Sequence, residues 1–165
     1  MKLKKTIQSA LNDQLNREHE ASYLYLGMSA FFEEQGYVGF AQWMRDQAKE
    51  EHDHMMKIYR YIFDRGGSVI FKDIKALTFK NKTMLEVIKF ALNHEKKVSK
   101  YIYDLVDLCY KEKDHATKNF LQWFVEEQVE EEASFAAIEQ KITRIGSNQA
   151  MLYLLDKELG SSHTG

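Results

Sequence analysis

Apolar residues recur at alternating spacings of three and four along most of the chain, which is the pattern of amphipathic α-helices. The pattern predicts four long helices over residues 4–34, 38–65, 83–111 and 115–145, and a short fifth helix over residues 148–159. Glycines fall at the breaks between these segments, at Gly36, Gly39, Gly66, Gly67 and Gly146. We therefore predict a single helical domain over residues 1–160, followed by a disordered tail over residues 161–165.

The composition supports an all-α chain. Its 165 residues contain no proline and only eight glycines, so little interrupts a helix, and the length suits one domain. A formal net charge of −2 gives no electrostatic reason to expect a nucleic-acid partner. No apolar run is long enough to span a bilayer and no signal peptide is recognisable, so we expect no membrane partner and a cytoplasmic location. Cys109 is the only cysteine, which excludes a disulfide within the chain.

The loop lengths predict how the four long helices are connected. The first and third loops are only a few residues long, so each joins two antiparallel neighbours. Residues 66–82 form a longer crossover, which at about 3.3 Å per residue can travel the roughly 45 Å of a 30-residue helix. The second and third helices are then parallel, which is the ferritin-like arrangement of a four-helix bundle. Apolar residues are expected to pin the crossover to the bundle: Val69, Ile70, Phe71 and Ile74.

Polar residues interrupt the core-facing seam of every long helix. Each of these residues lies within about two positions of the midpoint of its helix, or roughly 3 Å along the axis at 1.5 Å per residue. Because they share one depth and one direction, their side chains are predicted to meet at the centre of the bundle. The six residues are Glu18, Glu51, His54, Glu95, Gln128 and Glu131.

Four carboxylates buried together would repel one another and cost several kcal/mol each to desolvate. No lysine or arginine occupies the seams, whereas two divalent cations would balance the four charges. Glu51-x-x-His54 places two ligands on one face of a helix, and oxygen ligands with one imidazole suit iron or manganese. Each motif alone is more often a solvated pair, so the prediction of a di-metal site depends on their coincidence at one depth.

These residues stand in a chain that closely resembles the non-haem bacterial ferritins from Leu11 to Leu159. The resemblance is carried by Asn16 to Glu18, Glu50 to Met55, Glu95, Asn119 to Gln128, and Tyr153 to Leu159. It implies that one iron ion is held by Glu18, Glu51 and His54. It also implies that Glu51 bridges to a second iron ion held by Glu95 and Glu131, with Gln128 beside it.

The resemblance also implies roles for residues next to this pair of iron ions. Tyr25, two turns after Glu18 on the same seam, resembles the family's tyrosine near the ferroxidase centre, which is placed for electron transfer or hydrogen bonding. The alternative for Tyr25 is an aromatic core residue. Glu50, Glu127 and Glu130 lie one position off the seams and match the third iron site of bacterial ferritins, and the alternative for them is a solvated acidic face.

Differences from bacterioferritins, rubrerythrins and miniferritins favour a non-haem ferritin. Bacterioferritins carry a second Glu-x-x-His on the fourth helix and a haem-ligating methionine just after the bridging glutamate. This chain has Gln128-x-x-Glu131 and His52 at those places, so we expect no haem. Rubrerythrins add a cysteine-rich iron domain, which this chain lacks. The DNA-protecting miniferritins lack the fifth helix, which this chain is predicted to have, so both families match it poorly.

The resemblance implies an iron-storage protein that oxidises ferrous iron with dioxygen or hydrogen peroxide and stores ferric mineral inside a hollow shell of 24 subunits. The fifth helix would then pack near a symmetry axis through Met151, Leu152, Leu154 and Leu155. Two alternatives stay open on the residues alone. One is a di-metal oxidase or peroxidase that acts on a small molecule without storing mineral, and the other is a structural bundle whose core glutamates are protonated or hydrogen-bonded.

Overall fold

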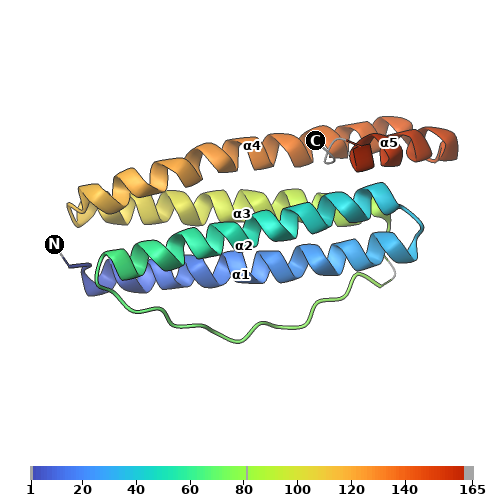
Figure 1. The fold of residues 1–165 in the computed structure, drawn as a ribbon. Helices are drawn as coiled ribbons and strands as arrows, with labels where there is room; N and C mark the ends of the chain where they lie inside the picture. The colour runs from blue at the N-terminus through green and yellow to red at the C-terminus, as the bar shows by residue number, and fades with distance from the viewer. Residues whose placement is uncertain (1, 81, 162–165) are drawn as a thin grey trace.

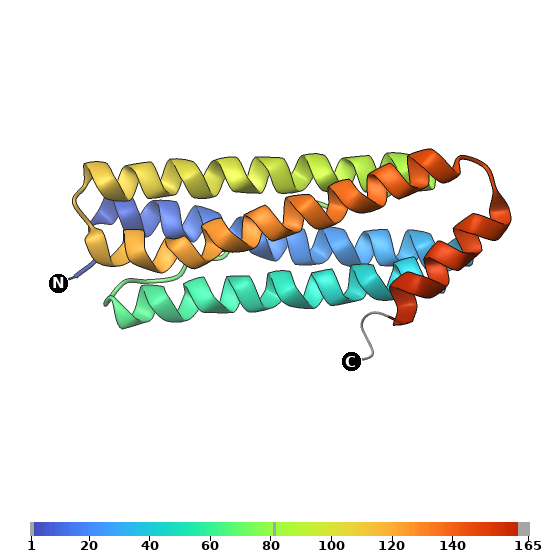
Figure 2. The same ribbon diagram turned by 90° about the horizontal axis from the view of Figure 1, so that it is seen from above.

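The computed structural model describes residues 2–80 and 82–161, which form five α-helices. Four long helices lie side by side and the short fifth helix folds back across one end of the bundle (Figures 1 and 2). The bounds agree with the predicted ones to within two residues. Residues 162–165 of the predicted tail lie outside the described residues, while Ser161 is the last residue of α5. The helices are α1 Lys5–Glu34, α2 Val38–Asp64, α3 Met84–Lys111, α4 His115–Ile145 and α5 Gln149–Ser161.

Local sequence signals account for where these helices begin and end. The Thr83 side chain accepts a hydrogen bond from the backbone N–H of Glu86 at the start of α3, and the Glu86 side chain accepts one from the backbone N–H of Thr83. This capping box satisfies two backbone donors that a helix terminus leaves free. At the start of α4 the Asp114 side chain accepts a single hydrogen bond from the N–H of Thr117, 3.0 Å away. After α2, Gly66 has a φ of +67°, a conformation that glycine adopts readily.

The crossover decides the topology. It leaves the end of α2, runs the length of the bundle beside α1, and reaches the start of α3 at the opposite end (Figure 1). Consequently α2 and α3 are parallel, whereas α1 with α2, and α3 with α4, are antiparallel pairs joined by short loops. This confirms the predicted ferritin-like bundle.

Two asparagines of α1 bind the backbone of the crossover, in addition to contacts from some of the predicted apolar residues. The Asn12 side chain donates to the Ser68 carbonyl (2.9 Å) and accepts from the Ile70 N–H (2.7 Å). One turn later the Asn16 side chain repeats this pattern with the backbone of Ile70 and Lys72. Of the predicted apolar residues, Val69 packs against the apolar cluster and the Phe71 ring contacts the rings of His19 and Tyr59. The expectation was wrong for Ile70, whose side chain is 61% exposed. An extended segment lying on a helix needs partners for its backbone groups, which apolar side chains cannot supply.

The hydrophobic core is divided into two parts. One apolar cluster fills the end of the bundle near α5 and includes Ala21, Ala48, Ala91 and Phe135. The other fills the opposite end and includes Leu15, Met55, Val98 and Phe124. In each long helix the buried polar residues lie between the members of the two clusters: Glu18, Glu51, Glu95, Gln128 and Glu131. The predicted polar level is therefore a real layer across the middle of the bundle.

The fifth helix is docked on α2. Asp156, which is buried, accepts a hydrogen bond from the N–H of Phe40 near the start of α2 at 2.9 Å. Gly39 makes this approach possible, because a Cβ on it would lie 1.7 Å from the Asp156 carbonyl oxygen. The expectation that all four apolar residues of this helix pack at a symmetry axis needs correction. Leu152 and Leu155 are buried within the subunit, whereas Met151 and Leu154 are 46% and 56% exposed.

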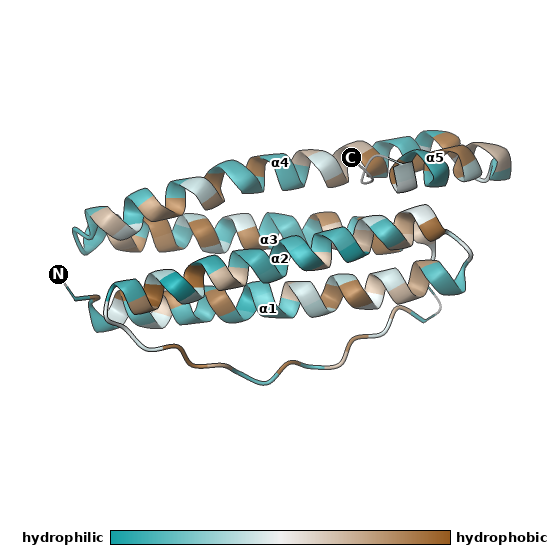
Figure 3. Cartoon of the chain, viewed as in Figure 1, coloured by the Kyte–Doolittle hydropathy of each residue, from teal (hydrophilic) through white to brown (hydrophobic). Residues whose placement is uncertain are grey.

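Every helix carries both hydrophilic and hydrophobic residues along its length, and the crossover also carries hydrophobic stretches (Figure 3). Exposed apolar side chains occur on α1 at Leu26 and on the crossover at Ile70 and Phe71. Among the helices of the described residues, none combines the length and the apolar character needed to cross a membrane.

Candidate metal centre

The most compact part of the polar layer is a group of three ligands from α1 and α2. One side-chain atom from each of Glu18, Glu51 and His54 lies within 4.8 Å of the other two. The His54 Nδ1 atom is 3.4 Å from Glu51 Oε2 and 4.0 Å from Glu18 Oε2. All three residues are at most 5% exposed. Glu51 and His54 face the same way because residues three apart share one side of a helix, and Glu18 meets them from the antiparallel neighbour.

The other half of the layer comes from α3 and α4. Glu95 is fully buried and accepts a hydrogen bond from the Gln128 amide at 3.2 Å. Glu131 is 7% exposed and accepts one from the Gln47 amide at 2.7 Å. These carboxylates therefore have neutral hydrogen-bond partners. Among the described residues, Glu18, Glu51 and His54 are the one group of three acidic, histidine or cysteine ligands within 4.8 Å, so Glu95 and Glu131 are not gathered as closely.

Tyr25 lies against this second half. Its phenol donates a hydrogen bond to Glu95 Oε1, and its ring is completely buried. Burial, followed by the charge of Glu95, holds the pKa of Tyr25 well above its usual value. The phenol is therefore kept protonated beside a carboxylate that can receive its proton.

Burial raises the pKa of every central carboxyl, and for each it is the largest cause. The pKa of Glu18 and of Glu51 lies well above the usual value, and the neighbouring carboxylates add to the shift. The pKa of Glu95 is raised to about 7 and that of Glu131 to about 8. No lysine or arginine is found among the buried residues of the described chain. Without a bound cation, protons on these carboxyl groups reduce the negative charge of the layer at neutral pH.

This donor set fits divalent iron. Carboxylate oxygens and one imidazole nitrogen are hard and intermediate ligands of the kind that bind iron or manganese, and sulfur is absent from the group. A cation between the carboxylates would offset both the repulsion and the desolvation that raise their pKa values. Binding would release protons from these groups, since a carboxylate must be ionised to act as a ligand.

The acidic residues predicted for a third iron site lie at the edge of the layer. Glu127 is partly buried, with Oε2 4.0 Å from His54 Nε2. Glu50 and Glu130 are exposed. None of the three belongs to the compact ligand group. The structure therefore places Glu127 next to His54, but does not gather the three carboxylates into one site.

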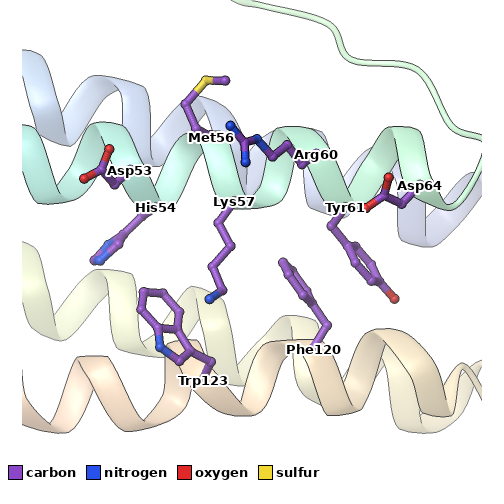
Figure 4. Close-up of a pocket in the computed structure, with 9 residues that line it drawn as sticks. All are labelled: Asp53, His54, Met56, Lys57, Arg60, Tyr61, Asp64, Phe120 and Trp123. Carbon is purple, nitrogen blue, oxygen red and sulfur yellow. The ribbon is translucent and has the colours of Figure 1, made fainter.

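A cavity of about 590 Å³ opens between α2 and α4 beside His54. Figure 4 shows His54 and Lys57 extending from α2 towards Trp123 on α4. The Lys57 amine lies 3.8 Å from the centre of the Trp123 ring, and the His54 ring meets Trp123 edge to face at 5.2 Å. Of the three residues in the compact group, only His54 lines this cavity.

Two residues of the site were not predicted from the sequence. The buried Gln14 amide donates to Glu18 Oε1 at 2.7 Å, and the buried Gln47 amide donates to Glu131 at 2.7 Å. Gln14 lies one turn before Glu18 and Gln47 one turn before Glu51. For Gln14 the spacing of four from Glu18 was an available signal, because side chains four apart on a helix are neighbours. Helical spacing gave no such signal for Gln47, because its partner Glu131 lies on α4.

Comparison with known proteins places the chain among ferritins. The sequence pattern of the ferritin family, described as a ferritin-like domain, matches residues 8–145. The bacterial non-heme ferritin of Staphylococcus aureus strain MRSA252 is 43% identical over 159 residues, which cover 96% of each chain. A solved structure of an engineered closed form of the Archaeoglobus fulgidus ferritin superposes with a TM-score of 0.94 at 42% identity, covering 96% of this chain and 97% of the other. The open-pore ferritin of the same archaeon gives a TM-score of 0.95 at 41% identity, covering 96% and 98%.

Proposed function

The chain belongs to the ferritin family, whose function is the oxidation and storage of iron, and we propose that the central polar layer is its di-iron ferroxidase centre. The observation that carries this proposal is the convergence of four buried carboxylates and one histidine on a level that separates two apolar clusters. No buried cation balances those carboxylates within the described chain. Ferrous iron is the substrate that would occupy this place.

In the proposed centre, Glu18, Glu51 and His54 hold one ferrous ion. Glu51 bridges to a second ion, which Glu95 and Glu131 hold. The position of Glu51 between the two halves supports the bridge: it hydrogen-bonds to Glu18, while the charges of Glu95 and Glu131 raise its pKa. Movement of Glu95 and Glu131 toward Glu51 on loading is part of this proposal, because their present partners are neutral amides and a phenol.

The proposed reaction passes one electron from each of two ferrous ions to dioxygen, which with two protons yields hydrogen peroxide. With hydrogen peroxide as the oxidant, the same two electrons and two protons yield water. Carboxylate ligands favour the reaction because hard anionic oxygens stabilise the ferric state. Tyr25 and Gln128 act on Glu95, through the phenol and amide hydrogen bonds respectively, and so orient it toward the second ion.

Storage requires that the ferric product leave the centre. We propose that Glu50, Glu127 and Glu130 form the third iron site and receive iron on the side of the bundle where Glu127 approaches His54. The mineral would then form within a shell of 24 subunits in the cytoplasm. The high similarity to ferritins over 96% of the chain supports this assembly.

Replacement of Glu51 by alanine tests the ferroxidase assignment. We expect the rate of ferric-oxo absorption after addition of dioxygen to anaerobically loaded ferrous protein to fall by at least about 10-fold, because both ions lose a ligand. The matched control is Glu20→Ala, which removes an exposed glutamate from α1 and should leave the rate unchanged. Oxidation at the wild-type rate in Glu51→Ala would overturn the assignment.

A further inference from the structure

Three polar side chains of α1 form a hydrogen-bonded line that ends at the compact ligand group. The Arg17 guanidinium donates through Nη1 to Gln14 Oε1 at 3.3 Å, and the Gln14 amide donates through Nε2 to Glu18 Oε1 at 2.7 Å. Arg17 is partly buried, whereas Gln14 and Glu18 are at most 1% exposed. The second oxygen of Glu18, Oε2, lies 4.0 Å from His54 Nδ1. One carboxylate oxygen is therefore held by Gln14, and the other faces the ligand group.

The Arg17 guanidinium is itself held in place by its surroundings. Its central carbon lies 3.7 Å from the centre of the Tyr101 ring on α3, and a planar guanidinium stacks well on an aromatic face. Asp13, four residues earlier, would be the usual ion-pair partner on a helix, but the Lys72 amine binds its Oδ1 at 2.5 Å. None of the ion pairs formed within the described residues includes Arg17. The guanidinium is thus left to bind the Gln14 amide.

This contact selects one of two orientations of the Gln14 amide. In the observed orientation the N–H group meets the Glu18 carboxylate. After a half turn of the amide, its carbonyl oxygen would meet the carboxylate and repel it. A guanidinium carries donors only, so Arg17 binds the oxygen of the amide and stabilises the observed orientation. Its charge also polarises the amide, which strengthens the hydrogen bond that Gln14 donates to Glu18.

We propose that Arg17 is a positioning residue of the first iron site, which we define as Glu18, Glu51 and His54. Arg17 acts through Gln14, which keeps Glu18 Oε1 occupied and Glu18 Oε2 turned toward the ion. This inference rests on the proposed ferroxidase centre and adds a residue outside its ligand set. Without Arg17, the Gln14 amide turns between its two orientations. Glu18 then rotates more freely, so the first iron site loses both affinity and a defined ligand geometry.

Gln128 differs from Gln14 in how its amide is oriented. Its Nε2 atom has three acceptors on α3, which are the Glu95 carbonyl at 3.2 Å, Glu95 Oε2 at 3.2 Å and Ser99 Oγ at 3.3 Å. Among the described residues, the Gln14 amide donates to Glu18 alone. Several acceptors therefore fix the Gln128 amide, whereas the orientation of the Gln14 amide depends on the cation at its oxygen.

Titration of full-length protein with Co²⁺ under nitrogen tests the proposal, because the visible d–d absorption of Co²⁺ reports the number and arrangement of its ligands without oxidation. Loss of this band in His54→Ala assigns it to the first iron site. We expect Arg17→Met to change the band and to lower the Co²⁺ affinity by about 3- to 10-fold, less than the roughly 10- to 100-fold typical of a direct partner of a ligand. Arg144→Met removes an exposed arginine of α4 and is the matched control, which should leave band and affinity unchanged.

A double-mutant cycle shows whether Arg17 acts through Gln14. In a Gln14→Met background, Arg17→Met should lower the affinity no further, because the connecting amide is already absent. Tyr101→Leu should weaken Co²⁺ binding in the same direction as Arg17→Met, while Tyr101→Phe keeps the ring and should bind as the wild type does. An undiminished effect of Arg17→Met in the Gln14→Met background would indicate action through charge alone and would overturn the proposal.

Thermal unfolding of the metal-free variants separates a positioning role from a structural one. If Arg17→Met lowered the unfolding midpoint but kept the wild-type band and affinity, Arg17 would only support the fold and the inference would fail. Wild-type binding with no change in stability would overturn it equally. A wild-type band that persists in His54→Ala would instead contradict the proposed centre itself, so the two failures are distinguishable.

Discussion

At the scale of single residues, the buried carboxylates of the central layer lower the stability of the metal-free fold, and the same carboxylates suit the binding of cations. Glu18 and Glu51 are almost completely buried, and each raises the energy of the other when both are ionised. The amides of Gln14, Gln47 and Gln128 satisfy some carboxylate oxygens but contribute no positive charge. A core of this kind is poorly suited to an empty protein and well suited to one that binds cations.

The pH dependence of the metal-free protein follows from these groups. The pKa values of Glu95 and Glu131 in the folded state, about 7 and about 8, lie above the ordinary 4.5. Between pH 4.5 and these raised pKa values the folded protein binds more protons than the unfolded chain, so raising the pH favours unfolding. This contribution is fully present below pH 4.5 and is lost as the pH rises through the folded pKa values.

We therefore expect the midpoint of thermal unfolding, measured with excess chelator, to fall as the pH rises from about 5 to about 8. Glu131→Gln should make this decline less steep, because it removes one raised carboxyl and keeps the shape of the side chain. Glu20→Gln, at an exposed position of α1, should not alter it. A midpoint that rises across this range in the wild type would contradict the account.

At the scale of elements, the bundle depends on two attachments that amphipathic patterning does not reveal. The crossover is held by backbone hydrogen bonds to Asn12 and Asn16. The fifth helix is held by Asp156 at the start of α2 and by the close approach of the chain at Gly39. Both attachments satisfy polar backbone groups that apolar packing alone would leave without partners.

Substitution of Gly39 by alanine should detach α5. The added Cβ would lie 1.7 Å from the Asp156 carbonyl oxygen, which belongs to backbone and cannot turn away. We expect a loss of about 1–3 kcal/mol in the free energy of unfolding and faster amide hydrogen exchange within α5. Gly27→Ala is the matched control, because its Cβ would meet only the Phe79 ring at 3.5 Å and alanine favours a helix by up to about 1 kcal/mol. Equal protection of α5 in both variants would argue against the docking role of Gly39.

At the scale of the whole molecule, one bundle completes the proposed centre but encloses no space for mineral. Every proposed ligand comes from the same chain, so oxidation does not need a partner subunit. Storage of mineral, by contrast, does need partner subunits. Apolar side chains exposed on α1 and on the crossover, among them Leu26, Ile70 and Phe71, are candidates for burial between subunits.

Assembly and oxidation should therefore be separable. We expect light scattering of the wild type to show a single particle of 24 subunit masses. Leu26→Glu should reduce that particle to small oligomers, since a charge buried in an apolar interface is costly. The first ferrous ions should still be oxidised at the wild-type rate per subunit, while retention of ferric mineral is lost. A wild type that remains a monomer or dimer would contradict the proposed shell and leave the centre untouched.

The sequence by itself determined the five helices, their order, the long crossover and the level of the polar layer. Each of these depends on local periodicity, on loop length or on depth along a helix, all of which are properties of the linear chain. It also predicted Glu18, Glu51 and His54 as one ligand group, and these three side chains lie close together in the structure, while their role as iron ligands stays a prediction. The division of iron between two ions and the role of Glu50, Glu127 and Glu130 stay predictions.

Only the tertiary structure decided which side chains touch across helices. Three features depend on rotamers and helix rotation: Gln14 and Gln47 as partners of the carboxylates, the asparagine attachment of the crossover, and the stacking of the Tyr25 ring on Phe135. The exposure of Ile70 shows the same limit, since apolar character alone did not indicate which residues of the crossover face the bundle. A periodic sequence defines the face of each helix, but the contacts between faces depend on how whole elements pack.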